Sequence, residues 1–390
     1  MSCISMAAPT AARPHHRADR SVADDRPTDD VTAPPPADTP VWMRRSLRDL
    51  LAEHDLAAAA ELPFPNDGWS GSRLTALEDR GRRFVLKRTS FAADWIVRST
   101  RDSMIREAVL AAGPDPFCPP LRFTHLGAAA VEPGVAAEGA AILMPDLSES
   151  LLSWDQGTGG GAAIPHDELD RVLAAVAEIH AQPWSQHVPD NWPWCPAAER
   201  ATLLTRPSAQ RYAAQGVWVG GRFIEGWDAF DRVAPPAARE LVATLSGDAG
   251  PLVEALAALP ATGLHGDLKL ANVALHDNGE ASFIDWQMAS LGPVALELGW
   301  FLVANVAQLP DGPDRMLDRY LGALRAAGGS HVVGDWEAQR DLVLIMGLLL
   351  RGWRKGLDAE ADLTLPTGAS AVDDLTWWCA SAVEAAARRL

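Results

Sequence analysis

Apolar residues follow two different spacings along the chain. Residues 83–87 and 140–147 contain short apolar runs, which predict two β-strands. Residues 65–72 are rich in Gly, Ser and Pro and predict a loop between two further short strands. Apolar residues at helical spacing begin near residue 47 and near residue 104, and they also occur over residues 167–184. Helical spacing then dominates the C-terminal part of the chain. The helices predicted there are residues 299–309, 313–327, 336–356 and 371–389.

A β-hairpin is predicted between residues 273 and 284. Residues 273–275 form an apolar strand, residues 277–279 read Asp-Asn-Gly, and residues 281–284 are again apolar. Asp-Asn-Gly is a tight-turn signal, so the second strand should run back along the first. The hairpin would therefore bring Asp285 beside Asn272.

The first 40 residues follow neither spacing. They are rich in Pro, Ala, Asp and Arg, and residues 33–37 read Ala-Pro-Pro-Pro-Ala. Such a segment has little apolar surface to bury, which predicts a disordered tail. An alternative is a start codon assigned too far upstream, because Met43 stands where the ordered pattern begins.

Composition excludes several classes of protein. The chain has 390 residues, of which 48% are hydrophobic, enough for two or more lobes with a sizeable core. Its net charge of −17 argues against a nucleic-acid partner, which would require a basic face. The longest apolar run, residues 342–350, is too short to span a bilayer, and no signal peptide is visible, so no membrane partner is expected.

The cysteines argue for a reducing compartment. Cys3, Cys118, Cys195 and Cys379 are widely scattered and form no C-x-x-C pair. Neither a zinc site nor a disulfide framework is therefore predicted, and a cytoplasmic location fits.

Candidate chemistry is concentrated between residues 264 and 301. His265-Gly266-Asp267 is followed after four residues by Asn272, and Asp285 comes eighteen residues after Asp267. Kinases use the pattern H-R-D-x-x-x-x-N followed by D-F-G, in which one carboxylate receives the hydroxyl proton and the other two side chains hold Mg²⁺. A chance hairpin turn with surface carboxylates is the alternative, but the loop, the hairpin and the second Asp together favour phosphoryl transfer.

Two departures from that pattern identify a family. Gly266 replaces the Arg, and Trp286 follows the second Asp, so the chain resembles the aminoglycoside phosphotransferase family of small-molecule kinases over residues 45–390. Gly292-Pro293 and the helix start after them also resemble the family, although Glu297 stands where an Asp is usual. A similar family helix ends in a histidine like His180, for which a structural role is favoured.

The resemblance implies a two-lobed, protein-kinase-like α+β fold. Residues 41–144 would form a small N-lobe with an antiparallel sheet, and residues 145–390 a mostly helical C-lobe. ATP or GTP would lie between the lobes. A helix begins near Pro293 and no Ala-Pro-Glu segment follows Asp285, which argues against a protein kinase.

The resemblance also implies the nucleotide contacts. Ser70, Gly71 and Ser72 would cover the phosphates with backbone amides. Lys87 would pair with the α and β phosphates and with Glu107, although a lysine at a strand end is ordinarily just solvated. In the hinge, the Pro145 carbonyl would accept a hydrogen bond from the adenine amine, and the Leu147 amide would donate one to the ring.

In the catalytic loop, Asp267 would receive the proton of the substrate hydroxyl. Asn272 and Asp285 would hold Mg²⁺ through hard oxygen atoms. Lys269 would neutralise the γ-phosphate during transfer; the alternative is a solvated loop lysine.

For the acceptor, the C-terminal stretch suggests a cation. Asp373, Asp374 and Trp377 would suit an amine-bearing, polyhydroxylated ligand, which places an aminoglycoside or amino sugar first. A solvated acidic face, or pairing with Arg351 and Lys355, explains the same carboxylates. Other small metabolites as acceptors, and a nucleotide-binding pseudokinase, remain alternatives. We expect a monomer or weak dimer.

Overall fold

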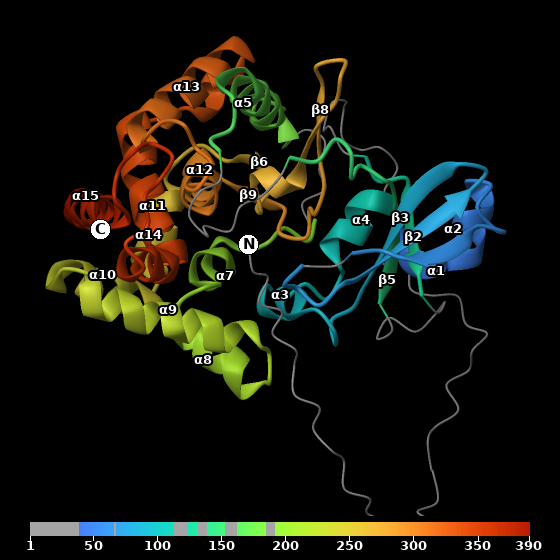
Figure 1. Cartoon of the computed structure of the whole chain (residues 1–390), viewed down its shortest axis with the longest axis horizontal. Coiled ribbons are helices and arrows are strands. Elements are labelled where there is room, and N and C mark those ends of the chain that lie inside the picture. The colour runs from blue at the N-terminus through green and yellow to red at the C-terminus, as the bar shows by residue number, and fades with distance from the viewer. Residues whose placement is uncertain (1–38, 66–67, 113–123, 132–138, 153–161, 185–191) are drawn as a thin grey trace, which may run out of the picture. The chain divides into compact units, whose positions relative to one another are not determined.

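An antiparallel sheet of five strands forms the N-lobe, by which we mean the described residues from 41 to 145, one residue beyond the predicted boundary at 144 (Figure 1). The strand order is β1-β2-β3-β5-β4, so β3 and β5 lie next to each other inside the sheet. Each neighbouring pair runs antiparallel, and Lys87 of β3 stands opposite Ile142 of β5. The strands are β1 (Ala60–Pro63), β2 (Arg73–Asp79), β3 (Arg82–Thr89), β4 (Gly127–Ala130) and β5 (Ala140–Pro145).

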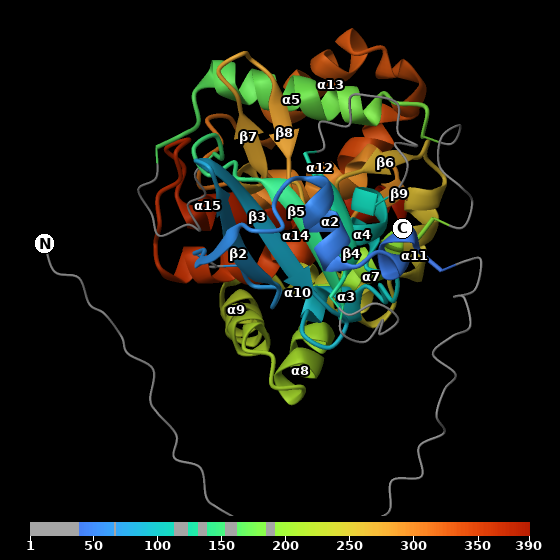
Figure 2. The ribbon, with the colours of Figure 1, turned by 90° about the vertical axis from the view of Figure 1, so that its right-hand side faces the viewer.

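Both faces of this sheet are buried, and alternation along β5 shows why. Ala140, Ile142 and Met144 pack in one apolar cluster with residues of α1 and α4, whereas Ala141 and Leu143 pack in another with residues of α2. Successive strand residues point to opposite faces, so an uninterrupted apolar run implies cover on both sides. Figure 2 shows α2 lying across the face of the sheet turned to the viewer. The N-lobe helices are α1 (Val41–Arg44), α2 (Leu47–Glu53), α3 (Trp95–Ser99) and α4 (Arg106–Ala112).

Helices dominate the C-lobe, the chain after Pro145. α12 (Val294–Ala304) is its centre, because every one of its residues is buried. It packs on the long helix α14 (Trp336–Glu360) so closely that a Cβ on Gly299 would lie 2.8 Å from the Cβ of Met346. The other helices are α5 (His166–His180), α7 (Ala197–Thr202), α8 (Arg206–Ala214), α9 (Val219–Val233), α10 (Pro236–Gly247), α11 (Gly250–Ala257), α13 (Pro313–Ala326) and α15 (Ala371–Arg389).

Short strands and turns in the C-lobe carry the candidate chemistry. β7 (Val273–Leu275) and β8 (Ala281–Phe283) form the predicted hairpin, and β6 (Thr262–Leu264) pairs with β9 (Ser290–Gly292). The described part of the lobe also contains the 3₁₀ turns η2 (Leu270–Asn272) and η3 (Gly329–Val332).

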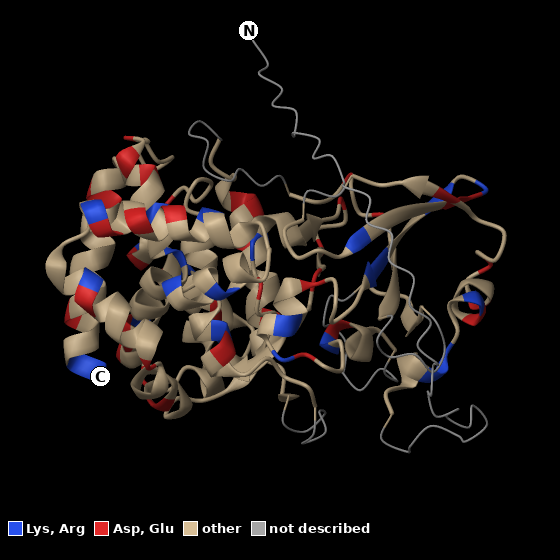
Figure 3. Cartoon of the chain, turned by 90° about the horizontal axis from the view of Figure 1, so that it is seen from below, with Lys and Arg blue, Asp and Glu red and all other residues tan. Residues whose placement is uncertain are grey.

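The structure is a computed structural model that describes residues 39–65, 68–112, 124–131, 139–152, 162–184 and 192–390. The predicted disordered tail, residues 1–40, lies outside the described residues except for its last two positions. Among the residues described, no helix combines the length and the apolar character that crossing a bilayer requires. In the view of Figure 3, Lys and Arg are interspersed with Asp and Glu over the C-lobe helices.

The predicted fold class is confirmed: a small antiparallel sheet precedes a mostly helical lobe. The helix predicted over residues 371–389 coincides with α15. The helix predicted over residues 299–309 is displaced, because it begins directly after Pro293 and ends at Ala304. Pro293 supplies an extended N-cap residue, and the amide of Asn305 closes the C-terminus on the carbonyl oxygen of Phe301.

Candidate active site

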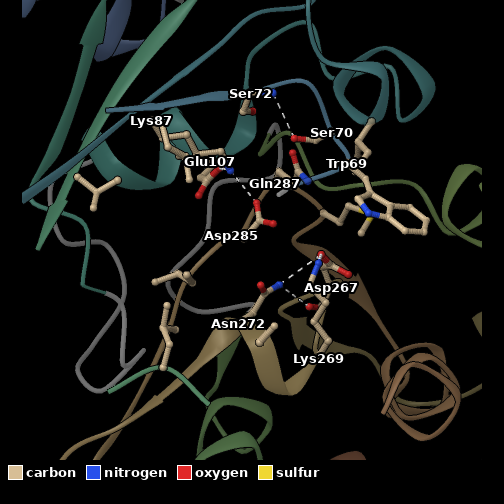
Figure 4. Close-up of a pocket in the computed structure, with 18 of the residues that line it drawn as sticks. Trp69, Ser70, Ser72, Lys87, Glu107, Asp267, Lys269, Asn272, Asp285 and Gln287 are labelled. Carbon is tan, nitrogen blue, oxygen red and sulfur yellow. Dashed lines mark hydrogen bonds and ion pairs between the residues drawn. The ribbon is translucent and has the colours of Figure 1, made fainter. Parts of the chain in front are cut away.

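One cleft of about 460 Å³ collects the predicted site residues (Figure 4). Its lining includes strands β2, β3 and β5 of the N-lobe and, from the C-lobe, the catalytic loop (residues 265–272) and the end of the hairpin. Nearly all predicted nucleotide, metal and catalytic residues line it: Ser70, Ser72, Lys87, Glu107, Pro145, Leu147, Asp267, Lys269, Asn272 and Asp285.

Lys87 lies between two carboxylates at the base of the cleft. Its Nζ is 2.6 Å from Oε2 of Glu107 and 2.6 Å from Oδ1 of Asp285. The Lys87–Glu107 contact is the pair that the sequence predicts, while the contact with Asp285 joins β3 of the N-lobe to the segment after β8 of the C-lobe. Figure 4 shows the three side chains pointing toward one another.

The charges of this triad shift all three pKa values. Burial lowers the pKa of Lys87, but the charges of Asp285 and Glu107 outweigh it and raise the pKa above its ordinary value. Burial alone would raise the pKa of Asp285, yet Lys87 and Lys269 lower it to about 2. The pKa of Glu107 is also lowered, because the charge of Lys87 and a hydrogen bond from His125 outweigh burial. At neutral pH the triad is therefore fully ionised.

The loop at residues 70–72 is fixed against the start of α3. The Trp95 amide donates to the Ser70 carbonyl oxygen at 3.0 Å, and Ser72 Oγ donates to Asp94 Oδ2 at 2.8 Å. Gly71 has φ of +102°, and a Cβ there would lie 2.4 Å from the Ala93 carbonyl oxygen. Only glycine fits this position, which explains how the backbone turns without bulk over the cleft.

The catalytic loop is held by its own backbone and by His265. The Nε2 of His265 donates to the Ile284 carbonyl oxygen at 2.9 Å, and its Nδ1 accepts from the Asp267 amide at 3.2 Å. These partners assign the ring proton to Nε2, since a carbonyl only accepts and an amide N–H only donates. The ring also contacts Trp286 at a centroid distance of 4.6 Å, so His265 ties the loop to the segment carrying Asp285.

Gly266 is required by space as well as by conformation. Its φ is +83°, and a Cβ would lie 1.8 Å from the Met288 carbonyl oxygen. The arginine that protein kinases carry at this point of the pattern could not be accommodated by this backbone.

Asp267 is buried and is oriented from two sides. Lys269 Nζ lies 3.0 Å from its Oδ2, and the Asn272 amide nitrogen donates to its carbonyl oxygen at 2.9 Å and to Oδ2 at 3.3 Å. Burial lowers the pKa of Lys269, but the charges of Asp267 and Asp285 outweigh it and keep the pKa above its ordinary value. The side chain of Lys269 is 20% exposed, so the predicted alternative of a fully solvated lysine does not describe it.

The hairpin delivers Asp285 to this group as the sequence predicts. The Ile284 amide donates to the Asn272 carbonyl oxygen at 3.0 Å, which sets the next residue beside the catalytic loop. Asp285 itself has φ of +67°, a left-handed conformation that is uncommon outside glycine and tends to occur at functional sites.

Asn272 and Asp285 fit the donor set that Mg²⁺ prefers. The Asn272 NH₂ group is committed to Asp267, so its carbonyl oxygen is the atom left for a cation. Asp285 accepts from Lys87 through Oδ1, which leaves Oδ2. One carboxylate and one amide oxygen match a magnesium ion that takes its remaining ligands from phosphates and water. Within the described residues, no group of three or more His, Cys, Asp or Glu side chains is placed to hold a metal ion.

Glu297, whose role the sequence left open, and His180, for which it favoured a structural role, both support the catalytic loop. Glu297 Oε1 accepts from the Gly266 amide at 2.5 Å, and its Oε2 accepts from the His265 amide at 3.3 Å. His180 Nε2 lies 2.7 Å from the same Oε2, and its Nδ1 lies 2.6 Å from the Tyr320 hydroxyl. Burial raises the pKa of Glu297, but His180, His265 and the Gly266 amide together lower it, which keeps the carboxylate ionised. His180 is thus a satisfied structural histidine, as expected.

Two further positioning residues were not predicted. Asn305 Oδ1 accepts from the Leu270 amide at 2.8 Å and so fixes η2, the turn that carries Asn272. The buried side chain of Arg106 donates to the Gln287 carbonyl oxygen at 2.6 Å and to the Pro193 carbonyl oxygen at 2.6 Å, which ties α4 to the segment after Asp285. Neither residue belongs to a sequence motif, so only their contacts reveal them.

The predicted acceptor residues do not line the cleft. Asp373, Asp374 and Trp377 lie on α15. Asp374 Oδ2 is 2.5 Å from Lys355 Nζ, and Asp373 is bonded to Ser370, the N-cap of that helix. The carboxylates are therefore used in pairing and capping, and the cleft presents instead Arg200, Arg351 and Arg354, none of which was predicted as a site residue.

A model of the phosphotransferase enzyme family matches residues 61–336. No curated protein matched the chain.

Solved structures with a similar fold include three phosphotransferases. The first is the choline kinase of Streptococcus pneumoniae, with 10% identity, a TM-score of 0.45, and coverage of 86% of this chain and 97% of that one. The second is a thermostable mutant of aminoglycoside phosphotransferase APH(4)-Ia with AMP-PNP and hygromycin B, with 16% identity, a TM-score of 0.41, and coverage of 86% and 98%. The third is the macrolide 2'-phosphotransferase of Brachybacterium faecium, with 18% identity, a TM-score of 0.40, and coverage of 88% and 96%. At these identities none of them identifies the acceptor of this chain.

Proposed function

The chain belongs to the phosphotransferase enzyme family, and on this premise we propose that it transfers the γ-phosphate of ATP to a hydroxyl group of a small molecule. The observation that carries the proposal is the meeting of Asp267, Asn272 and Asp285 with the Lys87–Glu107 pair in one cleft. Phosphoryl transfer depends on positioning and on charge stabilisation, and these residues supply both. We keep GTP as the alternative nucleotide.

Each residue has a role that follows from its contacts. Asp267 receives the hydroxyl proton as the acceptor oxygen attacks the γ-phosphorus, and its hydrogen bonds from Lys269 and Asn272 aim the carboxylate. Lys269 and Lys87 provide positive charge for the phosphates. Asn272 and Asp285 would hold Mg²⁺, which neutralises charge on the phosphates when it is bound.

The nucleotide would occupy the side of the cleft formed by the N-lobe. Ser70, Gly71 and Ser72 would cover the phosphates, and the hinge would bind adenine through the Pro145 carbonyl and the Leu147 amide. We place the boundary between the lobes at residue 145 for this reason. A cytoplasmic monomer or weak dimer is part of the same proposal.

Membership of the family does not specify which compound is the acceptor. An aminoglycoside or amino sugar was the first expectation, and it rested on Asp373, Asp374 and Trp377, which lie outside the lining of the cleft. Sugars, amino alcohols and amino acids are alternatives from the same reaction class. A nucleotide-binding pseudokinase is the alternative from another class, and the filled catalytic positions argue against it.

A screen of ADP release decides between these candidates. Purified chain would be incubated with Mg²⁺, ATP or GTP, and a panel of hydroxyl-bearing compounds, with Asp267→Asn as the matched control. This substitution keeps the size of the side chain but removes its charge and its capacity to accept the proton, so we expect kcat to fall by at least about 10²-fold. Nucleotide affinity should be largely kept. An Asp267→Asn enzyme of normal activity would place the chemistry elsewhere, and nucleotide binding without ADP release would favour the pseudokinase.

A further inference from the structure

Two buried arginines line the cleft beyond the catalytic loop. Arg200 of α7 is 1% exposed, and Arg351 of α14 is 7% exposed. Arginine is rarely buried without an anionic partner, because removing its charge from water is costly. The partners of these two side chains therefore indicate what this part of the cleft is built to hold.

The guanidinium of Arg200 has one nitrogen with a hydrogen-bond partner and two nitrogens without one among the described residues. Its Nε donates to the Gly266 carbonyl oxygen at 2.9 Å, directly beside Asp267 in the chain. Its guanidinium carbon lies 5.0 Å from the centre of the Trp300 ring. Both Nη1 and Nη2 are buried and have no hydrogen-bond partner within the described residues. The fork of the guanidinium, which suits a planar or tetrahedral oxyanion, is thus unused.

Arg351 has even fewer partners. It forms no hydrogen bond or ion pair with any residue in the described part of the chain, and its buried Nε is unpartnered. Its guanidinium lies 5.7 Å from the Trp300 ring and 5.6 Å from the Trp353 ring. The backbone at Arg351 departs from helical values, with φ of −134° and ψ of 16°, so α14 is kinked at this residue.

Among the described residues, no nearby carboxylate forms an ion pair with either arginine. Arg354 also lines the cleft, but its Nε is 2.8 Å from Asp358 Oδ1. Asp267 is held by Lys269, while Glu107 and Asp285 are held by Lys87. Burial, and then the charge of Arg354, lower the pKa of Arg351 to about 10, which still leaves it charged at neutral pH.

The two arginines belong to the acceptor side of the cleft. Arg200 donates to the carbonyl oxygen of Gly266, the residue before the proposed base Asp267, and Arg351 lies over the same Trp300 ring as Arg200. Ring contacts then continue away from Arg351: Trp353 meets Phe223 at 4.9 Å, and Phe223 meets Trp69 at 6.2 Å. These rings form an aromatic wall between the catalytic loop and the loop at residues 70–72, and Trp69, Phe223 and Trp353 all line the cleft.

We propose that the acceptor is an anionic alcohol: a hydroxyl compound with an aromatic or apolar body and a carboxylate or phosphate ester that pairs with Arg351 and Arg200. This inference rests on the proposed phosphotransferase function. The acceptor oxygen forms a bond to the γ-phosphorus, its proton passes to Asp267, and the bond between the γ-phosphorus and the bridging oxygen breaks to release ADP. The anion would dock beside Trp300, and the body would lie along the aromatic wall.

Matched probes test the charge of the ligand. Binding of mandelate, methyl mandelate and phenylglycinol would be measured by calorimetry on the full chain saturated with Mg²⁺ and a non-hydrolysable ATP analogue. The three share a phenyl ring and a hydroxyl group and differ in carrying a carboxylate, a neutral ester or an amine. We expect mandelate to bind at least about tenfold more tightly than the other two. Benzyl phosphate, added as a fourth probe, distinguishes a preference for phosphate from one for carboxylate.

Arg351→Met should abolish the preference for the anion, because the variant keeps length and apolar contact but removes the charge. Arg340→Gln is the matched control: it removes an arginine from the same helix where the side chain pairs with Asp314, outside the cleft lining. It should keep the preference. Equal binding of mandelate and its ester, tighter binding of phenylglycinol, or no binding of mandelate would each overturn the proposal.

A second measurement needs no ligand. Because Arg351 is charged and buried without a hydrogen bond or ion pair to any described residue, Arg351→Met should raise the melting temperature by about 2 °C or more, whereas Arg340→Gln should not raise it. A lower melting temperature for Arg351→Met would mean that the arginine stabilises the fold, which contradicts the proposal.

The two proposals fail in different ways. Phosphorylation of a cationic acceptor would support the transferase function but contradict the anionic acceptor. Mandelate binding that depends on Arg351, without any ADP release, would support the anionic ligand but contradict the transferase function.

Discussion

At the scale of single residues, the triad of Lys87, Glu107 and Asp285 joins the two lobes by charge. Glu107 is 1% exposed and Lys87 6% exposed, so each depends on the other for compensation. The carboxylates have lowered pKa values, and the stability they contribute is present above their unfolded pKa values near 4. It is lost as the pH falls through their folded values, about 2 for Asp285.

Lys87→Met should invert this pH dependence. Without the lysine, burial raises the folded pKa of Glu107 above its unfolded value, so the native state then binds more protons than the unfolded state. The variant should be less stable than the wild type at pH 7 and should gain free energy of unfolding between pH 7 and pH 5. The upper limit of the gain is about 1.4 kcal/mol for each unit by which the folded pKa exceeds the unfolded one, because pH 5 is still above the unfolded pKa near 4. Urea unfolding of both proteins at the two pH values measures it, and a variant whose stability is flat or falls on acidification contradicts the triad's role.

Asp285→Ala tests the predicted metal ligand separately from the base. It removes a carboxylate oxygen from the proposed Mg²⁺ site, so the affinity for Mg²⁺ and ATP together should fall by at least about tenfold. Calorimetric titration with Mg²⁺ and ATP gives the affinity, with Asp267→Asn as the comparison that should retain it. An unchanged affinity in Asp285→Ala would remove this residue from the metal site.

At the scale of elements, the catalytic loop is short but is fixed from several directions. Glu297 of α12 accepts its amides, Asn305 fixes η2, and His265 bonds to the segment after β8. A loop without regular secondary structure can be rigid when its backbone groups are satisfied in this way. The backbone of Gly266 also lies very close to Met288, because a Cβ on Gly266 would be 1.8 Å from the Met288 carbonyl oxygen. Alanine substitutions at Gly266 and at a second glycine test whether this close approach matters.

Gly266 and Gly279 both have a positive φ, but they differ in the space available for a Cβ, which makes Gly266→Ala and Gly279→Ala a matched pair. Gly279, at the tip of the hairpin, has φ of +90° and open space around its Cβ position, so alanine should cost only about 1 to 2 kcal/mol of backbone strain. At Gly266, where φ is +83°, the Cβ would also lie 1.8 Å from a backbone oxygen, which forces the loop to move. We expect the Gly266 variant to lose more stability and nearly all activity, and the Gly279 variant to keep its kcat. Chemical unfolding and steady-state kinetics provide the comparison; similar losses in the two would mean that the close approach does not matter.

At the scale of the whole molecule, the described residues that line the cleft fall between Phe64 and Arg354. Residues 1–38 lie outside the described part, and their composition offers little apolar surface. Deleting residues 1–38 should therefore leave the melting temperature and kcat nearly unchanged, because the segment has little with which to stabilise the rest. Thermal unfolding and ADP release by the shortened chain are the measurements. A fall of many degrees would show that the segment stabilises the remaining chain.

The sequence by itself determined the parts of this protein that depend on short separations along the chain. Asp267, Asn272 and Asp285 are joined by one turn and one hairpin, so their spacing alone predicts that they meet. The resemblance to the family implied Lys87 and Glu107 as a pair, and Lys87 Nζ lies 2.6 Å from Glu107 Oε2. The sheet, the helical lobe and the hairpin follow from apolar spacing, which reports local conformation and burial directly.

Only the tertiary structure decided which charges face the cleft. Asp373 and Asp374 resembled a substrate site, but helix α15 directs them into capping and pairing with Lys355. The sequence did not single out Arg200 or Arg351 as site residues. The packing of α7 and α14 around Trp300, with the kink at Arg351, buries both, and within the described residues it leaves Nη1 and Nη2 of Arg200 and Nε of Arg351 without a hydrogen-bond partner. Helical periodicity gives the spacing of side chains around a helix. It does not give which side of that helix faces the cleft once the lobe has assembled.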